Sequence, residues 1–238
     1  LTVRRGSRTL TLEASPQRDE SGEYRLGAWV RDSMAGIGTM TFYDPQSGTF
    51  GALGHGVTDV DTGKLLPLDH GSIMNASVKA VKKGEHGAPG ELKGDFDFAR
   101  DSGTLYANTE SGIFGKLSAQ DAAALGGKAY SIAARDEVKT GSATILATVN
   151  GNETKEYALE IEKVYPASGA SRNLLLRVTD EALLEKTGGV VQGMSGSAIL
   201  QNGKLIGAVT HVLLDDSSRG YGIFIENMLD AAGLSYEA

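Results

Sequence analysis

Residues 188–212, GGVVQGMSGSAILQNGKLIGAVTHV, are the most informative stretch of the chain. They contain the pentapeptide GMSGS at 193–197, which follows a glycine-containing loop and enters an apolar strand. A serine that attacks a carbonyl needs its hydroxyl exposed on a tight turn, with backbone N–H groups aimed at the developing oxyanion. Glycines let the backbone turn these N–H groups outward without a Cβ clash. Ser195 is therefore a candidate nucleophile, and an ordinary Gly-Ser turn is the alternative.

Short strand patterns separated by turn residues fill most of the remaining chain. Strands are predicted at residues 26–32, 37–43, 49–53, 73–81, 92–98, 103–108, 113–118, 129–134, 138–149, 155–164 and 172–179. Gly151-Asn152 separates two of them and is typical of a hairpin turn. Two short helices are predicted at 180–186, which ends before Gly188-Gly189, and at 225–232, which ends at Gly233. The pattern predicts an all-β barrel or sandwich with minor helices.

The first 24 residues differ from the rest. Residues 2–14 predict a hairpin that turns at Gly6-Ser7, and the polar segment 15–24 then marks a boundary. The chain opens in the middle of a strand pattern, so we expect it to be a piece of a longer protein.

Composition limits the class of protein. At about 150 residues per domain, 238 residues correspond to about 1.6 domains. Lys and Arg number 23 against 30 Asp and Glu, a net charge of −7, which argues against a nucleic-acid partner. No apolar run approaches ~18 residues, so we expect no membrane segment in this chain. It has no cysteine and therefore no disulfide.

Four histidines are candidates for the general base. His55 follows a strand and lies between two glycines that leave room around its ring. His70 lies in a plausible turn, and His211 ends an apolar strand. His86 lies in a charged loop, where we expect it to be solvated. We favour His55 as the base and keep His70 and His211 as alternatives.

The sequence indicates neither a metal nor a cofactor. The histidines are far apart, none shows an HxxH or HxxxH spacing, and no cysteine is available as a ligand. No phosphate-binding glycine motif opens a helix after a strand. We therefore expect chemistry that uses side chains and backbone alone.

Three longer blocks carry a resemblance to a known family. They are GAWVRDSMAGIGTMTFYDP at 27–45, FGALGHGVTD at 50–59 and the 188–212 stretch. Together they resemble the stage IV sporulation protein B (SpoIVB) serine peptidases of the chymotrypsin-like clan. The resemblance runs from Leu26 to Gly233. It implies an all-β fold of two six-stranded β-barrels, with the active site between them.

The resemblance also implies a biological role. Members of the family are serine endopeptidases that are secreted into the space between forespore and mother cell. They cleave a membrane-bound regulator of an intramembrane metalloprotease, which triggers sigma-factor processing, and they cleave themselves. Full-length members carry a membrane segment, then a PDZ domain, then the peptidase. By this comparison residues 1–24 are a remnant of the last PDZ strands with a linker, and residues 25–238 are the peptidase domain.

The matching motifs assign the family's site residues to positions of this chain. Ser195 of GMSGS is then the nucleophile, His55 of LGHG is the base, and the backbone N–H groups of Gly193 and Ser195 form the oxyanion hole. Met194 stands where the chymotrypsin-like motif has Asp. Activation through an ion pair from that Asp to a freed N-terminus is therefore not available here.

The catalytic acid is the most open assignment. The resemblance points to Asp180, fifteen residues before Ser195. Asp180 is also an excellent helix N-cap. In a double barrel the orienting acid usually comes from the first barrel, so Asp95, Asp97 and Asp121 are alternatives. A Ser-His dyad without an acid is another.

Two other functions compete with the active peptidase. One is a catalytically inactive barrel that binds proteins in sporulation, and the presence of both Ser195 and His55 argues against it. The other is an esterase. Its nucleophile elbow needs a strand-turn-helix context, whereas GMSGS enters a strand.

Overall fold

The computed structural model describes residues 1–28, 34–166 and 171–236. The chain divides into two units, Leu1–Gly36 and Ile37–Ala238. The first unit holds two antiparallel ribbons: β1 (Thr2–Arg5) with β2 (Arg8–Thr11), and β3 (Gln17–Arg18) with β4 (Tyr24–Arg25). Gly6 turns between β1 and β2 with φ of 62°, so the predicted hairpin is confirmed. The assignment of residues 1–24 to a PDZ remnant stays a prediction.

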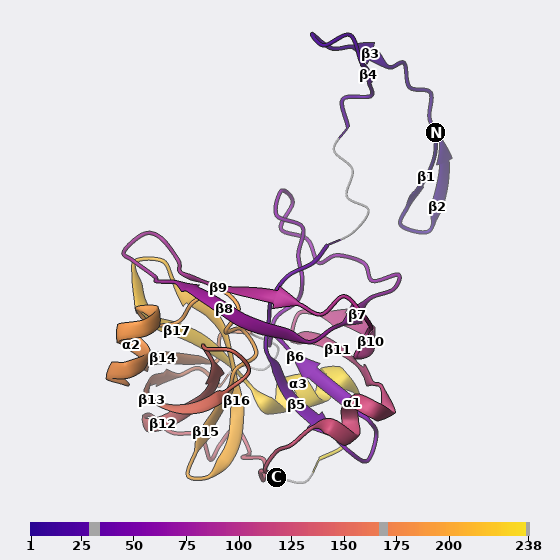
Figure 1. Ribbon diagram of the computed structural model, residues 1–238. Helices are drawn as coiled ribbons and strands as arrows, with labels where there is room; N and C mark the ends of the chain where they lie inside the picture. The colour runs from indigo at the N-terminus through magenta and orange to yellow at the C-terminus, as the bar shows by residue number, and fades with distance from the viewer. Residues whose placement is uncertain (29–33, 167–170, 237–238) are drawn as a thin grey trace. The chain divides into compact units, whose positions relative to one another are not determined.

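The second unit is built around a closed six-stranded barrel (Figure 1). In chain order its strands are β12 (Gly141–Thr148), β13 (Thr154–Val164), β14 (Leu174–Val178), β15 (Ala198–Gln201), β16 (Lys204–Leu213) and β17 (Asp216–Phe224). Around the barrel the order is β12-β13-β14-β17-β16-β15. Burial alternates along β12, where Ala143, Ile145 and Ala147 point into the core. Closure leaves this sheet without a free edge.

The other large sheet of this unit has five strands and is open. Its members are β5 (Met40–Asp44), β6 (Thr49–Ala52), β7 (Ser72–Ile73), β10 (Gly103–Thr109) and β11 (Gly112–Leu117), in the order β5-β6-β11-β10-β7. The all-β class is confirmed, but the implied second six-stranded barrel is replaced by this half-barrel.

A separate two-stranded ribbon lies outside the half-barrel. β8 (Ala76–Lys82) and β9 (Glu91–Phe96) pair with each other, and neither joins the five-stranded sheet. Val78 instead exchanges two backbone hydrogen bonds of 2.9 Å with Gly151 in the β12–β13 turn of the closed barrel. Figure 1 shows the ribbon running across the unit.

Most predicted strands match observed strands to within a few residues. The predicted strand 73–81 is wrong as one element, because it is divided into β7 and β8. The predicted strand 129–134 contains only an isolated bridge from Ile132 to Leu205. Of the predicted strand 26–32, residues 29–32 lie outside the described residues, and 26–28 are not strand.

Both predicted helices are present with their caps. Asp180 caps α2 (Glu181–Thr187), which ends at Gly188 with φ of 75°. α3 (Ile225–Ala232) ends at Gly233 with φ of 71°. A third helix, α1 (Ala119–Ala124), was not predicted. No helix among the described residues has the length and apolar character needed to cross a membrane.

Two hydrophobic clusters hold the second unit together. The larger fills the closed barrel around Ile145, Ile161 and Leu176. The smaller joins Phe114 of the open sheet to the outer side of the barrel and to Met228 of α3. The two sheets are thus packed into one body, with α3 between them (Figure 1).

Candidate active site

The loop that carries Ser195 depends on two glycines. Gly193 and Gly196 have φ of 97° and 94°, a region that other residues rarely adopt. A Cβ on Gly196 would also lie 2.0 Å from the Thr39 carbonyl oxygen and 2.6 Å from the Leu53 nitrogen. These glycines allow the loop to turn sharply against the segments before β5 and after β6.

Two backbone donors of this loop have no acceptor in the part of the chain that the structure describes. The N–H groups of Met194, Gly196 and Ser197 donate to the carbonyls of Val191, Val209 and Met194, at 3.1, 2.8 and 2.9 Å. Within the described residues, the N–H groups of Gly193 and Ser195 donate to no protein acceptor. One of these donors is the N–H of the half-buried Ser195 itself and the other lies two residues earlier, and a pair of free backbone donors beside a nucleophile can bind a developing oxyanion.

The Ser195 hydroxyl donates a 2.8 Å hydrogen bond to the Thr210 carbonyl of β16. In this rotamer its proton is directed at the backbone and not at a histidine. Hydrogen bonds between catalytic groups often form only when substrate binds, so this geometry is compatible with a resting enzyme.

A tight turn after the end of β6 places His55. Leu53 and Gly54 both have φ of 69°, so the chain reverses within two residues. A Cβ on Gly54 would lie 2.9 Å from Ile223 and 3.0 Å from Thr210, so the turn is pressed against β16 and β17. The His55 Nδ1 atom lies 2.9 Å from the carbonyl oxygen of Gly56.

Thr39 ties the two loops to each other. Its N–H donates to the Ser195 carbonyl at 2.9 Å, and its hydroxyl donates to the Gly193 carbonyl at 3.0 Å. The Leu53 N–H donates back to the Thr39 carbonyl at 3.2 Å. No motif marks Thr39, which alternates with Thr41 only in the predicted strand 37–43 and lies just before the observed β5. Residues two apart in a strand point to the same face of the sheet, but this pattern does not show which loop they contact.

His211 lies next to His55, with ring centroids 5.0 Å apart. Its Nδ1 atom is buried without a hydrogen-bond partner among the described residues. Burial, together with the charges of His55 and Arg172, lowers the pKa of His211 to about 4. His211 is therefore neutral near pH 7 and adds no charge beside His55.

The structure does not bring Asp180 into hydrogen-bond contact with His55. Its Oδ1 accepts from the Leu183 N–H at 3.0 Å, and its Oδ2 accepts from the Ala158 N–H at 3.3 Å. Asp180 follows β14, whose first residue, Leu174, pairs with Gly222 near the Ser195 loop. The four steps along β14 carry the chain about 13 Å away from that end.

The alternative acids are also engaged elsewhere. Asp95 is largely exposed, with Lys79 Nζ at 3.5 Å. Asp97 accepts from the Ala99 N–H at 3.0 Å. Asp121 accepts from both ends of the Arg100 guanidinium, and bonds from Arg100 and Ser118 hold its pKa well below the usual range. Among the described residues, no carboxylate bonds to the His55 ring.

The two remaining histidines are remote from this chemistry. His70 is exposed beside Asp69, and the Nδ1 of His86 faces the Asp215 carbonyl at 2.7 Å. Within the described part of the chain, no cluster of three or more acidic or histidine side chains is arranged to hold a metal ion.

Met194 is packed into the closed barrel. Its side chain is 1% exposed and belongs to the large core cluster. A carboxylate in this apolar position would need a buried cation. The methionine instead anchors the Ser195 loop by hydrophobic contact.

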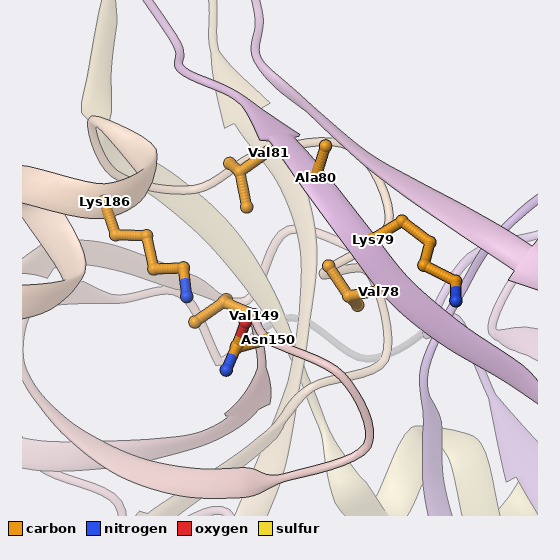
Figure 2. Close-up of a pocket in the computed structure, with 7 residues that line it drawn as sticks. All are labelled: Val78, Lys79, Ala80, Val81, Val149, Asn150 and Lys186. Atoms are coloured by element: carbon orange, nitrogen blue, oxygen red, sulfur yellow. The ribbon is translucent and has the colours of Figure 1, made fainter.

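A hollow of about 250 Å³ lies away from these residues (Figure 2). It is bordered by Val78 and Val81 of β8, by Asn150 in the β12–β13 turn and by Lys186 of α2. Neither Ser195 nor His55 lines it, so it does not belong to the candidate site.

The lowered pKa of His211 predicts a pH-dependent stability. In an unfolded chain histidine titrates near ~6.5, so between about pH 6.5 and 4 the unfolded state binds more protons than the folded state. Stability must therefore fall as pH falls through this window. We expect the unfolding free energy, measured by denaturant titration, to drop by up to about 2 kcal/mol more between pH 7 and 4.5 in the wild type than in His211→Gln. Equal losses in both proteins would show that His211 carries no such linkage.

Comparison with known proteins gives a family. A model of the family described as SpoIVB peptidase S55 matches residues 22–229. No curated protein matches the chain. Among solved structures, the inactive form of the Rv3671c protease matches with 18% identity and a TM-score of 0.41, covering 57% of this chain and 70% of that one. The active form, from M. tuberculosis, matches with 13% identity and a TM-score of 0.40, covering 89% and 97%.

The family match spans most of the chain, including the His55 and Ser195 loops. The chain therefore belongs to the SpoIVB peptidase S55 family and is a serine peptidase.

Proposed function

We propose that this chain is a serine endopeptidase of the sporulation signalling pathway. It cleaves a membrane-bound regulator of an intramembrane metalloprotease, and itself, in the space between forespore and mother cell. Family membership supports the peptidase activity. The substrate, the self-cleavage and the location rest on the resemblance of the three sequence blocks to the family.

Ser195 is the nucleophile in this proposal and His55 the general base. The observation that carries it is that the N–H groups of Gly193 and of the half-buried Ser195 have no acceptor among the described residues. The hydroxyl turns from the Thr210 carbonyl to His55 and attacks the scissile carbonyl carbon, and its proton passes to the imidazole. The peptide oxygen becomes an oxyanion between the two N–H groups. The imidazolium then protonates the leaving amine.

The identity of the acid stays a prediction. The geometry supports a capping role for Asp180, since both of its oxygens accept backbone N–H groups. It is also compatible with a Ser-His dyad, because the hydrogen bond of the His55 ring within the described residues is to a backbone carbonyl.

One observation favours the inactive binding module as a second candidate. The Ser195 hydroxyl rests on the Thr210 carbonyl, where it is not activated. A module of this kind would keep the fold but would not react with reagents that need an activated serine.

Labelling with a fluorophosphonate separates the two candidates. We expect the wild type to be labelled at Ser195 and Ser195→Ala to lose both labelling and peptide cleavage, because a missing nucleophile leaves only residual catalysis. Ser197→Ala is the matched control. Its hydroxyl lies in the same loop, is buried and has no partner among the described residues, so the variant should be labelled like the wild type. Absence of labelling in the wild type would support the binding module, and labelling that persists in Ser195→Ala would exclude Ser195 as the nucleophile.

Substitution of Asp180 separates its two possible roles. As a helix cap, Asp180→Asn should be nearly silent, because Asn caps about as well as Asp, whereas Asp180→Ala should lose ~1 kcal/mol of stability with little change in turnover. As the catalytic acid, Asp180→Asn should lose turnover by orders of magnitude at unchanged stability, because the amide favours the wrong tautomer. We expect the first pattern. The measurements are kcat on a peptide substrate and unfolding by denaturant, and a large loss of kcat in the Asn variant would restore Asp180 as the acid.

A further inference from the structure

The side chain of Asn108, at the end of β10, is fully engaged with the loop that follows His55. Its Oδ1 accepts from the Val57 N–H at 2.9 Å. Its Nδ2 donates to the carbonyls of Val57 and Leu66, at 2.8 and 2.9 Å. An N–H group can only donate and a carbonyl can only accept, so the carboxamide fits this position in one orientation.

The Val57 N–H and the Gly56 carbonyl belong to one planar peptide unit. Its oxygen is the atom that lies 2.9 Å from the Nδ1 of His55. Because a carbonyl oxygen can only accept, this contact requires the proton on Nδ1 and leaves Nε2 free. A free Nε2 is what a general base needs to take the proton of Ser195.

We propose that Asn108 is the positioning residue for His55 and acts through the Gly56–Val57 peptide. By holding the Val57 N–H it fixes the peptide plane, and with it the direction of the Gly56 carbonyl that selects the His55 tautomer. A carboxylate fills this role in a catalytic triad. The inference rests on the proposed role of His55 as base, and it explains how the ring is oriented without a bond to a carboxylate.

The chain offers a matched control at the same end of β10. The Thr109 hydroxyl donates to the Gly112 carbonyl at 3.1 Å and accepts from the Ser111 N–H at 3.2 Å. Both bonds lie within the β10–β11 turn and neither reaches the loop after His55. Thr109→Val therefore removes side-chain hydrogen bonds from the same end of the hairpin but keeps the hydrogen bonds between Asn108 and the loop after His55.

The test reads the His55 tautomer by nitrogen and carbon NMR in the full chain, in a Ser195→Ala background that prevents self-cleavage. We expect the proton on Nδ1 in this background, a rise of the Nε2–H form when Asn108→Ala is added, and no change with Thr109→Val. With Ser195 restored, Asn108→Ala should slow fluorophosphonate labelling by about tenfold or more, because a misplaced base loses its near-attack geometry. Thr109→Val should label at the wild-type rate.

An unchanged tautomer in folded Asn108→Ala, or an equal shift in Thr109→Val, would overturn the inference. If Asn108→Ala does not fold, the inference is tested on the Ser195→Ala protein with Asn108 intact. The inference then requires the Nδ1–H form and a through-hydrogen-bond coupling from the Val57 nitrogen to the Asn108 carboxamide carbon, and an Nε2–H form or a missing coupling contradicts it. The tautomer is measured without activity, so failure of the proposed function, seen as no labelling of the wild type, is distinguished from failure of this inference.

Discussion

Hydrogen bonds from Thr39 and Thr41 to the Ser195 loop are the contact on which the site depends. Thr39 holds the Ser195 and Gly193 carbonyls, and the buried Thr41 hydroxyl holds the Gly196 carbonyl at 2.7 Å. Thr41 and Gly196 are 155 residues apart in sequence. When the partner of a buried carbonyl is removed, the unsatisfied carbonyl costs about 1–3 kcal/mol of stability. These hydrogen bonds fix the Ser195 loop of the barrel against the sheet that precedes His55.

Two side chains next to the reactive groups of the site, His211 and Met194, carry no charge near pH 7. His211 stays neutral because of its burial, and Met194 fills an apolar position with a side chain that carries no charge. Among the described residues, the bond to the His55 ring comes from the polypeptide backbone, and the free donors around Ser195 are backbone N–H groups. In the proposed mechanism, the orientation of Ser195 and His55 therefore comes from peptide planes that glycines and the Asn108 carboxamide hold in place.

Local signals in the sequence predicted the elements but not their assembly. The strands β12 and β13, the Gly151 turn and the caps of α2 and α3 depend on near neighbours, and the structure has each of them. Ser195 and His55 could be proposed because glycines mark their turns. The partners of Thr39, His211 and Asn108 lie far along the chain, and no local pattern specifies them. The open half-barrel also escaped prediction, because β8 pairs with β9 and its Val78 bridges to Gly151 in the β12–β13 turn, and no local pattern specifies these partners.

The central claim is that Thr39 and Thr41 set the reactivity of Ser195, and its most direct measurement is the fluorophosphonate labelling rate of Thr39→Val/Thr41→Val. We predict a fall of about tenfold or more, about 1.4 kcal/mol of barrier, in a protein that remains folded by circular dichroism. Thr49→Val is the control, since Thr49 is buried on β6 but bonds to Lys116 and not to the Ser195 loop. It should label at the wild-type rate. A folded double variant that also labels at the wild-type rate would contradict the account.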